Sequence, residues 1–399
     1  MRGGSFASLC AVGFLARVSY SLARTPVLAL FAAALGAGPE AIGLAVASST
    51  VTGVFFKMPA GVFSDVMGRK RTLFLGLAFF AFAPLGYLGI SSYPALVAIR
   101  FLHGFATAIY SPVAMAVVAG VSGGRRAEML SWFSSITIIG NLLGAPLGGF
   151  LVTRLSGGAA PRIRDFHIIY GVVLACGLAS LVTAWLLLRG WTDRAPPATG
   201  RTLRAVLSQF RAGAGQILMD RRVLLASNLE GVQNLSVGAL EAFLPIYAVR
   251  VRGFSAFQAG LLWGIQILVT ILAKPMLGRW SDRRGRQAQL FWGMFVCAVP
   301  FALIPWFASY SVLLTLVAVY ALGEAVVTSC ASALVADLCR EEQLGSAMGV
   351  FGTVYDVGHA SGPLLAGALI GLTPNQDFRP GFGLIAALLA VAALAFRLV

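Results

Sequence analysis

Unbroken apolar runs of about 20 residues recur along the whole chain, and short hydrophilic gaps separate them. A run of this length crosses a bilayer as one α-helix, whereas a membrane barrel would show alternating segments of about 10 residues. Only 11% of the residues are charged, compared with about 25% in soluble domains. This composition cannot cover a water-facing surface, so the sequence predicts an all-α membrane protein.

Short segments rich in glycine, proline and serine separate the apolar runs and divide the chain into twelve predicted spans. The spans cover residues 8–35, 40–63, 72–90, 94–119, 128–153, 167–189, 223–248, 255–278, 287–308, 310–337, 344–371 and 379–398. The first apolar stretch is too long for the core of a signal peptide, so we expect an uncleaved first span.

A hydrophilic stretch from Lys57 to Arg71 returns 217 positions later, from Lys274 to Arg286. Chance rarely produces such agreement, so the chain contains two copies of one unit. We predict two six-span halves, residues 1–190 and 223–399, joined by a basic cytoplasmic linker at 191–222. The residues identical in register are Lys57, Gly61, Ser64, Asp65, Gly68 and Arg69, which match Lys274, Gly278, Ser281, Asp282, Gly285 and Arg286.

Arginine and lysine are concentrated in alternate gaps of this topology, at 69–71, 125–126, 189–222 and 279–286. Because loops with an excess of these residues stay in the cytoplasm, we expect both termini to be cytoplasmic. The protein is then a multi-pass component of the inner or plasma membrane. The same distribution accounts for the formal net charge of +15, so we expect no nucleic-acid partner.

The second part of the linker, Leu203 to Leu218, carries apolar residues at 203, 206, 207, 210 and 217. Two interpretations stay open. One is an amphipathic helix on the anionic membrane surface, and the other is a solvated linker.

No signature of an enzyme or of a resident cofactor occurs in the sequence. The five cysteines are dispersed without the spacing of a zinc site or a disulfide framework. There is no phosphate-binding loop and no nucleophile elbow. We therefore expect no enzymatic activity, no cofactor and no resident metal.

Three motifs resemble those of the major facilitator superfamily. Within that family the chain is most similar to the twelve-span drug/proton antiporter-like exporters. The stretch Gly61–Arg71 resembles the cytoplasmic-loop signature of that family. Arg100–Gly104 resembles its fourth-span motif, and Gly140–Gly149 its fifth-span motif. The resemblance implies two pseudo-symmetric six-helix bundles that transport a solute by alternating access.

The resemblance also implies roles for the loop residues. Asp65 with Arg69, and Asp282 with Arg286, are expected to latch the halves together at the cytoplasmic face. A simpler interpretation is that they anchor the loop and set topology. Gly61 and Gly278 are expected to allow close helix approach, and Gly68 and Gly285 to form the turns. The small residues of the fifth span, Gly140, Gly144, Gly148 and Gly149, predict close packing, and Pro146 a bend.

Charged residues within the spans point to the mechanism, since each costs at least about 2.5–3.5 kcal/mol at membrane depth unless it has a partner or a wet cavity. They form polar stripes at helical spacing in four spans, which in the resembled family line the central cavity. The stripes comprise Arg17, Tyr20, Ser21 and Arg24; Arg100 and His103; Glu230, Asn234 and Glu241; and Tyr320, Glu324 and Thr328.

The spans of the first half carry cations, and those of the second half carry mostly acids. Either these charges form ion pairs that break and re-form as the halves rock, or the arginines bind an anionic substrate while an acid carries the proton. Lys57, Glu230 and Lys274 lie nearer the cytoplasmic ends and are candidate gate residues. Asp356 and His359, one turn apart, predict a proton relay or gate, a structural pair, or a metal site.

These observations favour a secondary transporter that exports a small organic solute in exchange for protons. The alternatives are proton-linked uptake of an organic anion, and a receptor or assembly factor of the same fold that transports nothing. Arg17 and Arg24 stand where many drug–proton exporters carry an acid. They favour an anionic, zwitterionic or neutral substrate. We expect the chain to act as a monomer.

Overall fold

The computed structural model describes residues 4–122, 125–191, 221–339 and 344–398. Within these ranges the side chains at 4–5, 62, 65–66, 126–127, 221–222, 281–284 and 344–346 lie outside the description. Nearly all described residues are helical, and none is in a strand. The helices are α1 (Gly4–Leu22), α2 (Val27–Ala34), α3 (Pro39–Met67), α4 (Arg69–Tyr87), α5 (Tyr93–Val121), α6 (Arg126–Ser156), α7 (Ile163–Leu188), α9 (Arg221–Ile246), α10 (Ala256–Arg284), α11 (Arg286–Leu303), α12 (Tyr310–Leu338), α13 (Leu344–Gly371) and α14 (Phe378–Arg397), with a π-helical turn η1 (Tyr247–Val251) and two short 3-10 turns (Ile304–Trp306 and Pro374–Gln376).

The helices form twelve spans. The first span is broken between Leu22 and Val27, where Pro26 lacks the N–H that a continuous helix needs. Ten segments of the described chain are long and apolar enough to cross a membrane. The two other long helices, α4 and α13, contain 19 and 28 residues and complete the set.

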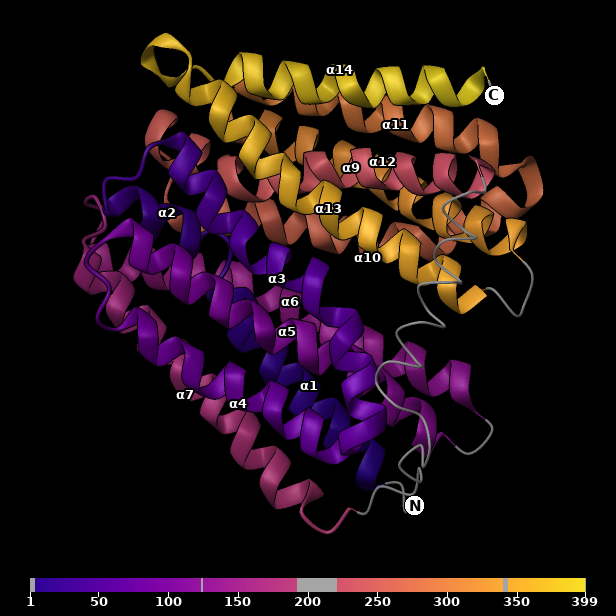
Figure 1. The fold of residues 1–399 in the computed structure, drawn as a ribbon. Helices are drawn as coiled ribbons and strands as arrows, with labels where there is room; N and C mark the ends of the chain where they lie inside the picture. The colour runs from indigo at the N-terminus through magenta and orange to yellow at the C-terminus, as the bar shows by residue number, and fades with distance from the viewer. Residues whose placement is uncertain (1–3, 123–124, 192–220, 340–343, 399) are drawn as a thin grey trace.

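The spans are arranged in two blocks, α1–α7 and α9–α14 (Figure 1). α3 packs against α13 and α6 against α10, and these two pairs supply most of the contact between the blocks. The predicted fold class, an all-α membrane protein of two six-helix bundles, is confirmed. The predicted linker lies almost wholly outside the described residues, since α7 ends at Leu188 and α9 begins at Arg221.

The two blocks are arranged differently at the two ends of the molecule. Their ribbons lie close together at the end where α2 lies, which we call the far end (Figure 1). They diverge toward the end that carries both chain termini, which we call the motif end (Figure 1). The turns at Gly68 and Gly285 are at the motif end, because α3 and α10 run there from the far end.

Close packing at the far end depends on glycine. A Cβ added to Gly149 of α6 would clash with the carbonyl of Ala256 at the start of α10. A Cβ added to Gly43 of α3 would clash with the carbonyl of Pro363 in α13. Both contacts join one half to the other, so these glycines allow the halves to meet at this end.

The other small residues of the fifth-span motif serve a different contact. Gly140, Gly144 and Gly148 pack against the first span, where a Cβ on Gly144 would clash with Ser21. Pro146 lies at the interface between the halves, opposite Gly260 and Gly264 of α10. The motif therefore packs α6 against both a helix of its own half and a helix of the other half.

The two loop motifs make equivalent turns at the motif end. Gly68 has a φ of 94° and Gly285 a φ of 87°, values that favour glycine. Arg69 Nη1 donates to the carbonyl of Ala116 in α5 at 3.2 Å. Arg286 Nη1 lies 3.0 Å from Asp337 Oδ2 in α12. Each arginine thus binds the fourth span of its own half.

Two expectations for these motifs have different outcomes. The close helix approach at Gly61 and Gly278 needs correction, and the latch cannot be described. No described atom lies within 4 Å of a Cβ added to Gly61 or Gly278. Among the described residues, no helix therefore packs against the Cβ position of either glycine. The side chains of Asp65 and Asp282 lie outside the description, so the latch that they were expected to form stays a prediction.

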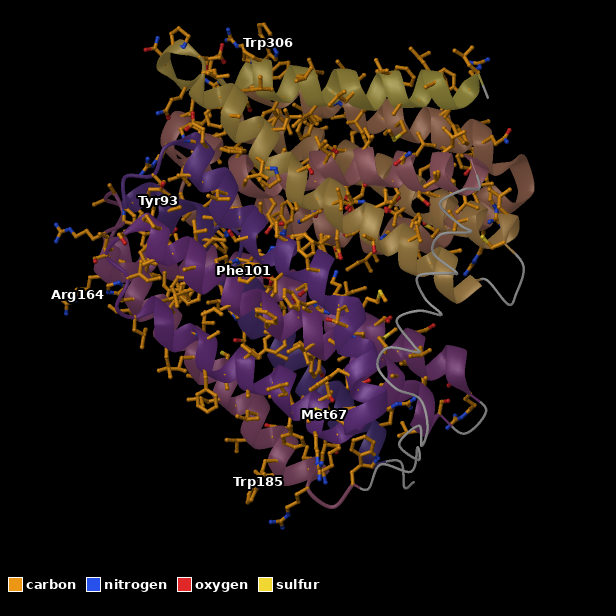
Figure 2. All side chains as sticks on the ribbon, in the orientation of Figure 1. Met67, Tyr93, Phe101, Arg164, Trp185 and Trp306 are labelled. Carbon is orange, nitrogen blue, oxygen red and sulfur yellow. The ribbon has the colours of Figure 1, made fainter. Side chains whose placement is uncertain are left out.

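Exposed aromatic side chains mark both ends of the molecule. Figure 2 shows Tyr93 and Trp306 at the far end, and Trp185 on α7 toward the motif end. Trp306 is 59% exposed and Trp185 is 55% exposed. Because Trp and Tyr gather at membrane–water interfaces, these residues agree with a bilayer that covers the middle of the spans.

Candidate functional site

A cavity of about 260 Å³ lies between the two halves. Its wall is built from α1 and the break that follows it, and from α6, α9, α10, α12 and α13, so both halves contribute. Most of the lining side chains are polar or charged, and α10 supplies both polar and apolar ones. The lining residues are Arg17, Tyr20, Ser21, Arg24, Thr25, Ile138, Asn141, Val237, Glu241, Trp263, Gln266, Ile267, Thr270, Ile271, Lys274, Glu324, Tyr355 and His359.

Arg24 and Glu241 form an ion pair across the cavity. Arg24 Nε contacts Glu241 Oε1, and the Glu241 side chain is almost completely buried. Thr25 Oγ1 donates to the same oxygen at 3.2 Å. Because α1 ends at Leu22, Arg24 and Thr25 lie in the broken part of the first span. The break places a cation and a hydroxyl beside a carboxylate of the other half.

His359 of α13 joins this pair through one ring nitrogen. Its Nε2 lies 2.8 Å from Arg24 Nη2 and 3.0 Å from Glu241 Oε2. α9 and α13 come close enough for this because Gly238 has no side chain. A Cβ at that position would clash with the carbonyl of His359. Nε2 can accept a hydrogen bond from Arg24 only without a proton, and it can donate to Glu241 only with one.

The other polar residues of α1 face the same cavity. Arg17 Nη2 donates to Ser111 Oγ of α5 at 2.9 Å, and Ser21 Oγ donates to the carbonyl of Asn141 at 2.8 Å. The ring of Tyr20 lies between two guanidinium groups, 6.0 Å from that of Arg24 and 5.0 Å from that of Arg100. Such distances permit cation–π attraction.

Arg100 and His103 lie behind this wall, not on it, which corrects the expectation that they line the cavity. Both are completely buried. His103 Nδ1 is 3.3 Å from the hydroxyl of Tyr87, and its ring packs edge-on against Tyr20. Arg100 therefore supports the cavity through Tyr20, which separates it from the open space.

A second polar group lies in the other half. Gln266 and Thr270 of α10 both donate to Glu324 Oε2, Thr270 at 3.3 Å. Asn234 and Glu230 of α9 are buried behind this wall. Glu230 is completely buried, so it is not a gate residue with a water-exposed head as expected. Lys274, the other gate candidate of this half, lines the cavity.

Lys57 of α3 and Asp356 of α13 form a second ion pair between the halves, with Nζ 2.6 Å from Oδ2 and 2.8 Å from Oδ1. The Lys57 side chain is 43% exposed and that of Asp356 is 8% exposed. This pairing corrects the expected pairing of Asp356 with His359, since each binds a different partner. No group of three potential metal ligands occurs in the described part of the chain.

Sequence reasoning missed several residues of the site. Thr25 follows the predicted stripe of the first span directly, but the break in that span changes where it points. Trp263, Gln266, Thr270 and Lys274 share one face of α10 at helical spacing. That polar stripe in the eighth span is visible in the sequence and would have indicated a cavity wall.

The family model described as Major Facilitator Superfamily matches residues 9–311 and 235–399. The chain belongs to this superfamily. An uncharacterized MFS-type transporter of Methanocaldococcus jannaschii is 22% identical over 395 residues, which cover 97% of this chain and 95% of that protein. The multidrug transporter MdfA of Yersinia pestis is 24% identical over 252 residues, which cover 62% of this chain and 57% of that protein.

Solved structures of transporters share the fold. The nucleoside transporter NupG superposes with a TM-score of 0.83 at 14% identity, covering 100% of this chain and 99% of that one. A D-xylose–proton symporter superposes with a TM-score of 0.78 at 15% identity, covering 98% and 96%. The protein is a multi-pass secondary transporter of the superfamily and not an enzyme.

Proposed function

We propose that this transporter exports a small organic solute in exchange for protons, with the Arg24–Glu241–His359 group as the site where protons act. One observation carries the proposal. These three side chains come from both halves and meet at the cavity, and a single nitrogen, His359 Nε2, lies within hydrogen-bond distance of both a cation and a carboxylate. A proton on that nitrogen changes which of the two it binds.

The coupling follows from this exchange of partners. Without a proton on Nε2, His359 accepts from Arg24, and Arg24 also neutralises Glu241. When the ring takes up a second proton and becomes a cation, Nε2 donates to Glu241 and His359 takes over part of the neutralisation. The attraction between Arg24 and the second half then weakens, because Glu241 is shared with a second cation. Protonation therefore loosens one contact between the halves, as alternating access requires.

The charge of the cavity wall supports an anionic, zwitterionic or neutral substrate. Three cations, Arg17, Arg24 and Lys274, face two carboxylates, Glu241 and Glu324. Guanidinium groups bind carboxylate or phosphate groups well because of their fixed donor geometry. Arg17 donates only to Ser111 among its described partners, so its other donors remain for a substrate.

The direction of transport is supported by the relatives. The similarity to a multidrug transporter supports export, and the fold shared with a D-xylose–proton symporter is compatible with proton coupling. We place the motif end in the cytoplasm, with both termini there, because its loops are rich in arginine and lysine. We further propose the inner or plasma membrane as its location and a monomer as the working unit.

The test begins with a thermal-shift screen of the purified protein. Benzoate and p-aminohippurate serve as anionic probes, chloramphenicol as a neutral probe, and tetraphenylphosphonium as a cationic probe, since a true ligand raises stability. A probe that binds is then assayed for flux in proteoliposomes with and without a pH gradient. Flux against the probe's own gradient, driven by protons moving the other way, supports the proposal. Flux that ignores the pH gradient contradicts it.

His359→Gln separates coupling from movement of the solute. Glutamine keeps the size and polarity of the side chain but does not take up a proton. We expect this variant to lose proton-driven accumulation and to keep solute-for-solute exchange, which needs no net proton movement. Full proton-driven accumulation by His359→Gln would remove His359 from the coupling step.

Uptake of an organic anion is the second candidate function, and the excess of cations on the wall favours it. In that case the anionic probes accumulate inward with protons, and Arg17→Ala weakens their binding more than Arg17→Lys does. A protein that binds a probe but produces no flux in either direction would instead be a receptor of the same fold.

A further inference from the structure

A groove of about 740 Å³ lies at the motif end of the second half, and none of the described residues that line it lines the cavity between the halves. Its walls come from α9, α11, α12 and α14. α11 and α14 run side by side along the outer edge of this half, away from the first half (Figure 1). The groove therefore belongs to the part of the molecule that faces lipid.

The groove wall changes from polar to apolar with depth in the membrane. Gln287 at the start of α11 and Arg397 at the end of α14 lie at its outer edge. Phe291 and Trp292 lie one turn further along α11, and Leu334 lies one turn inside the end of α12. A lipid has the same order of chemistry, since a polar headgroup is followed by apolar chains.

The outer edge of the groove carries an excess of positive charge. Arg397 lies with its Cζ 5.0 Å from the centre of the Phe291 ring and forms no ion pair within the described part of the chain. α9 begins with two further arginines at 221–222, one turn before the groove wall. Arg286 at the start of α11 is already matched by Asp337, at 3.0 Å. The unmatched guanidinium groups fit a phosphate, which accepts charge-assisted hydrogen bonds.

The inner part of the groove offers apolar surface at the depth of the first chain carbons. Trp292 is 63% exposed, and its ring lies 5.2 Å from that of Phe291. Trp is favoured at the level of the headgroups because its ring is amphipathic. The volume of the groove also lies within the range of about 300–1,000 Å³ that is usual for small-molecule sites.

We infer that this groove binds one anionic phospholipid, with its phosphate at Arg397 and the upper part of its acyl chains against Phe291 and Trp292. The occupant is a lipid and not the transported solute, so the inference is independent of the proton coupling proposed above. The proposed cytoplasmic placement of the motif end adds only the leaflet, since anionic lipids of the cytoplasmic leaflet attract arginines beside the spans.

Quenching of tryptophan fluorescence tests the inference on the full-length protein in nanodiscs. The matrix lipid is phosphatidylcholine, and a small fraction is replaced by brominated phosphatidylglycerol or by brominated phosphatidylcholine, because bromine quenches a tryptophan that it touches. The chain has seven tryptophans, so the difference between the wild type and Trp292→Phe isolates the groove. We expect half-maximal quenching of Trp292 at about a fivefold lower fraction of the anionic lipid, the preference that one arginine gives at an anionic lipid surface.

Three variants, each measured with and without Trp292→Phe, separate charge from shape. Arg397→Gln should lose the preference for the anionic lipid, and Arg397→Lys should keep part of it. Ala288→Phe places a ring in the groove while Arg397 stays, and it should also lose the preference. Arg189→Gln is the matched control and should keep it. Arg189 lies 5.5 Å from the ring of Trp185 at the same end of the first half, and neither residue lines the groove.

Inorganic phosphate added to the buffer distinguishes a lipid from a free anion. We expect the quenching by the anionic lipid to persist, and its loss would mean that the groove takes up free phosphate instead.

Other outcomes would also overturn the inference. Equal quenching of Trp292 by the two lipids would mean contact with bulk lipid only. Quenching by neither lipid would mean that another segment of the chain or a second copy covers the groove. An Arg397→Gln protein with the wild-type preference would remove the guanidinium from the site. If Arg397→Gln does not fold, Ala288→Phe decides, and an unchanged preference in that variant contradicts the groove as the binding place.

Discussion

Arg24 and Glu241 contact each other across the cavity, and Glu241 lies 217 positions after Arg24, the offset that relates the two loop motifs. The two residues therefore occupy equivalent positions in the two halves. Arg250 donates to the carbonyl of Ala33 at 2.5 Å with the same offset of 217. Equivalent positions can touch only near the pseudo-twofold axis, so both contacts lie on it. Rocking of the halves changes geometry least near the cavity, which suits the Arg24–Glu241 contact as a site shared by both conformations, whereas the Arg250–Ala33 contact lies at the far end, where the halves open and close.

Loss of the Arg24 guanidinium is expected to damage both stability and transport. Arg24→Ala leaves Glu241 buried with only His359 as a cation partner, and breaking a buried ion pair costs on the order of 3 kcal/mol. We expect a lower unfolding temperature and at least a tenfold loss of proton-driven flux. The double variant Arg24→Glu with Glu241→Arg restores the pair of opposite charges and is expected to recover stability. Wild-type flux in Arg24→Ala would show that the pair has no part in transport.

The ion pair between Lys57 and Asp356 is expected to bias the conformational equilibrium mildly. Because Lys57 is 43% exposed, the pair contributes about 1 kcal/mol or less, a population change of about fivefold at most. Spin labels at Met67 and Met348, at the motif ends of α3 and α13, would report the separation of the halves. We expect a broader distance distribution in Lys57→Ala, and recovery when Lys57→Asp is combined with Asp356→Lys. An unchanged distribution would mean that the pair does not hold these helices together.

Sequence alone was sufficient for the spans, because the bilayer thickness dictates the length of each apolar run. It was also sufficient for the face of the first span, since Arg17, Tyr20 and Ser21 share one side of α1 at any rotation of the neighbouring spans. The sequence did not indicate which residues bind each other across helices. Asp356 stood next to His359 in the sequence, but Lys57 and Glu241, from two other spans, bind these residues.

The cause of that limit is the rotation of α13 against α9. A Cβ on Gly358 would clash with the carbonyl of Gly231, so glycine contacts decide how close the two helices lie and which side chains they bring together. Such contacts leave no polar signal in the sequence. The same holds for Arg100, whose burial behind Tyr20 depends on the packing of α5, although its position in the polar stripe was evident.

Arg250 is expected to hold the far end closed. It belongs to the second half, and its hydrogen bond to Ala33 ends on the carbonyl-rich C-terminus of α2, where a cation is favoured. A hydrogen bond from a charged donor contributes about 1.5 kcal/mol, which corresponds to about a tenfold change in population. Arg250→Ala should therefore lengthen the distance between spin labels at Leu155 and Val251. Arg250→Lys keeps the charge, so its label distance should fall between that of the wild type and that of Arg250→Ala. Identical distances in all three proteins would contradict the role of Arg250.

Closure of the far end also requires a small residue at position 149. Gly149→Val places a branched side chain against the carbonyl of Ala256 in the other half, where even a single Cβ has no room. We expect the halves to separate at this end and proton-driven flux to fall at least tenfold, while each half stays folded because the clash is between them. Gly171→Val on α7 is the matched control, since no described atom lies within 4 Å of its Cβ position. The same Leu155 and Val251 labels measure the separation, and a Gly149→Val protein with wild-type distances and flux would show that the far end does not need this contact to close.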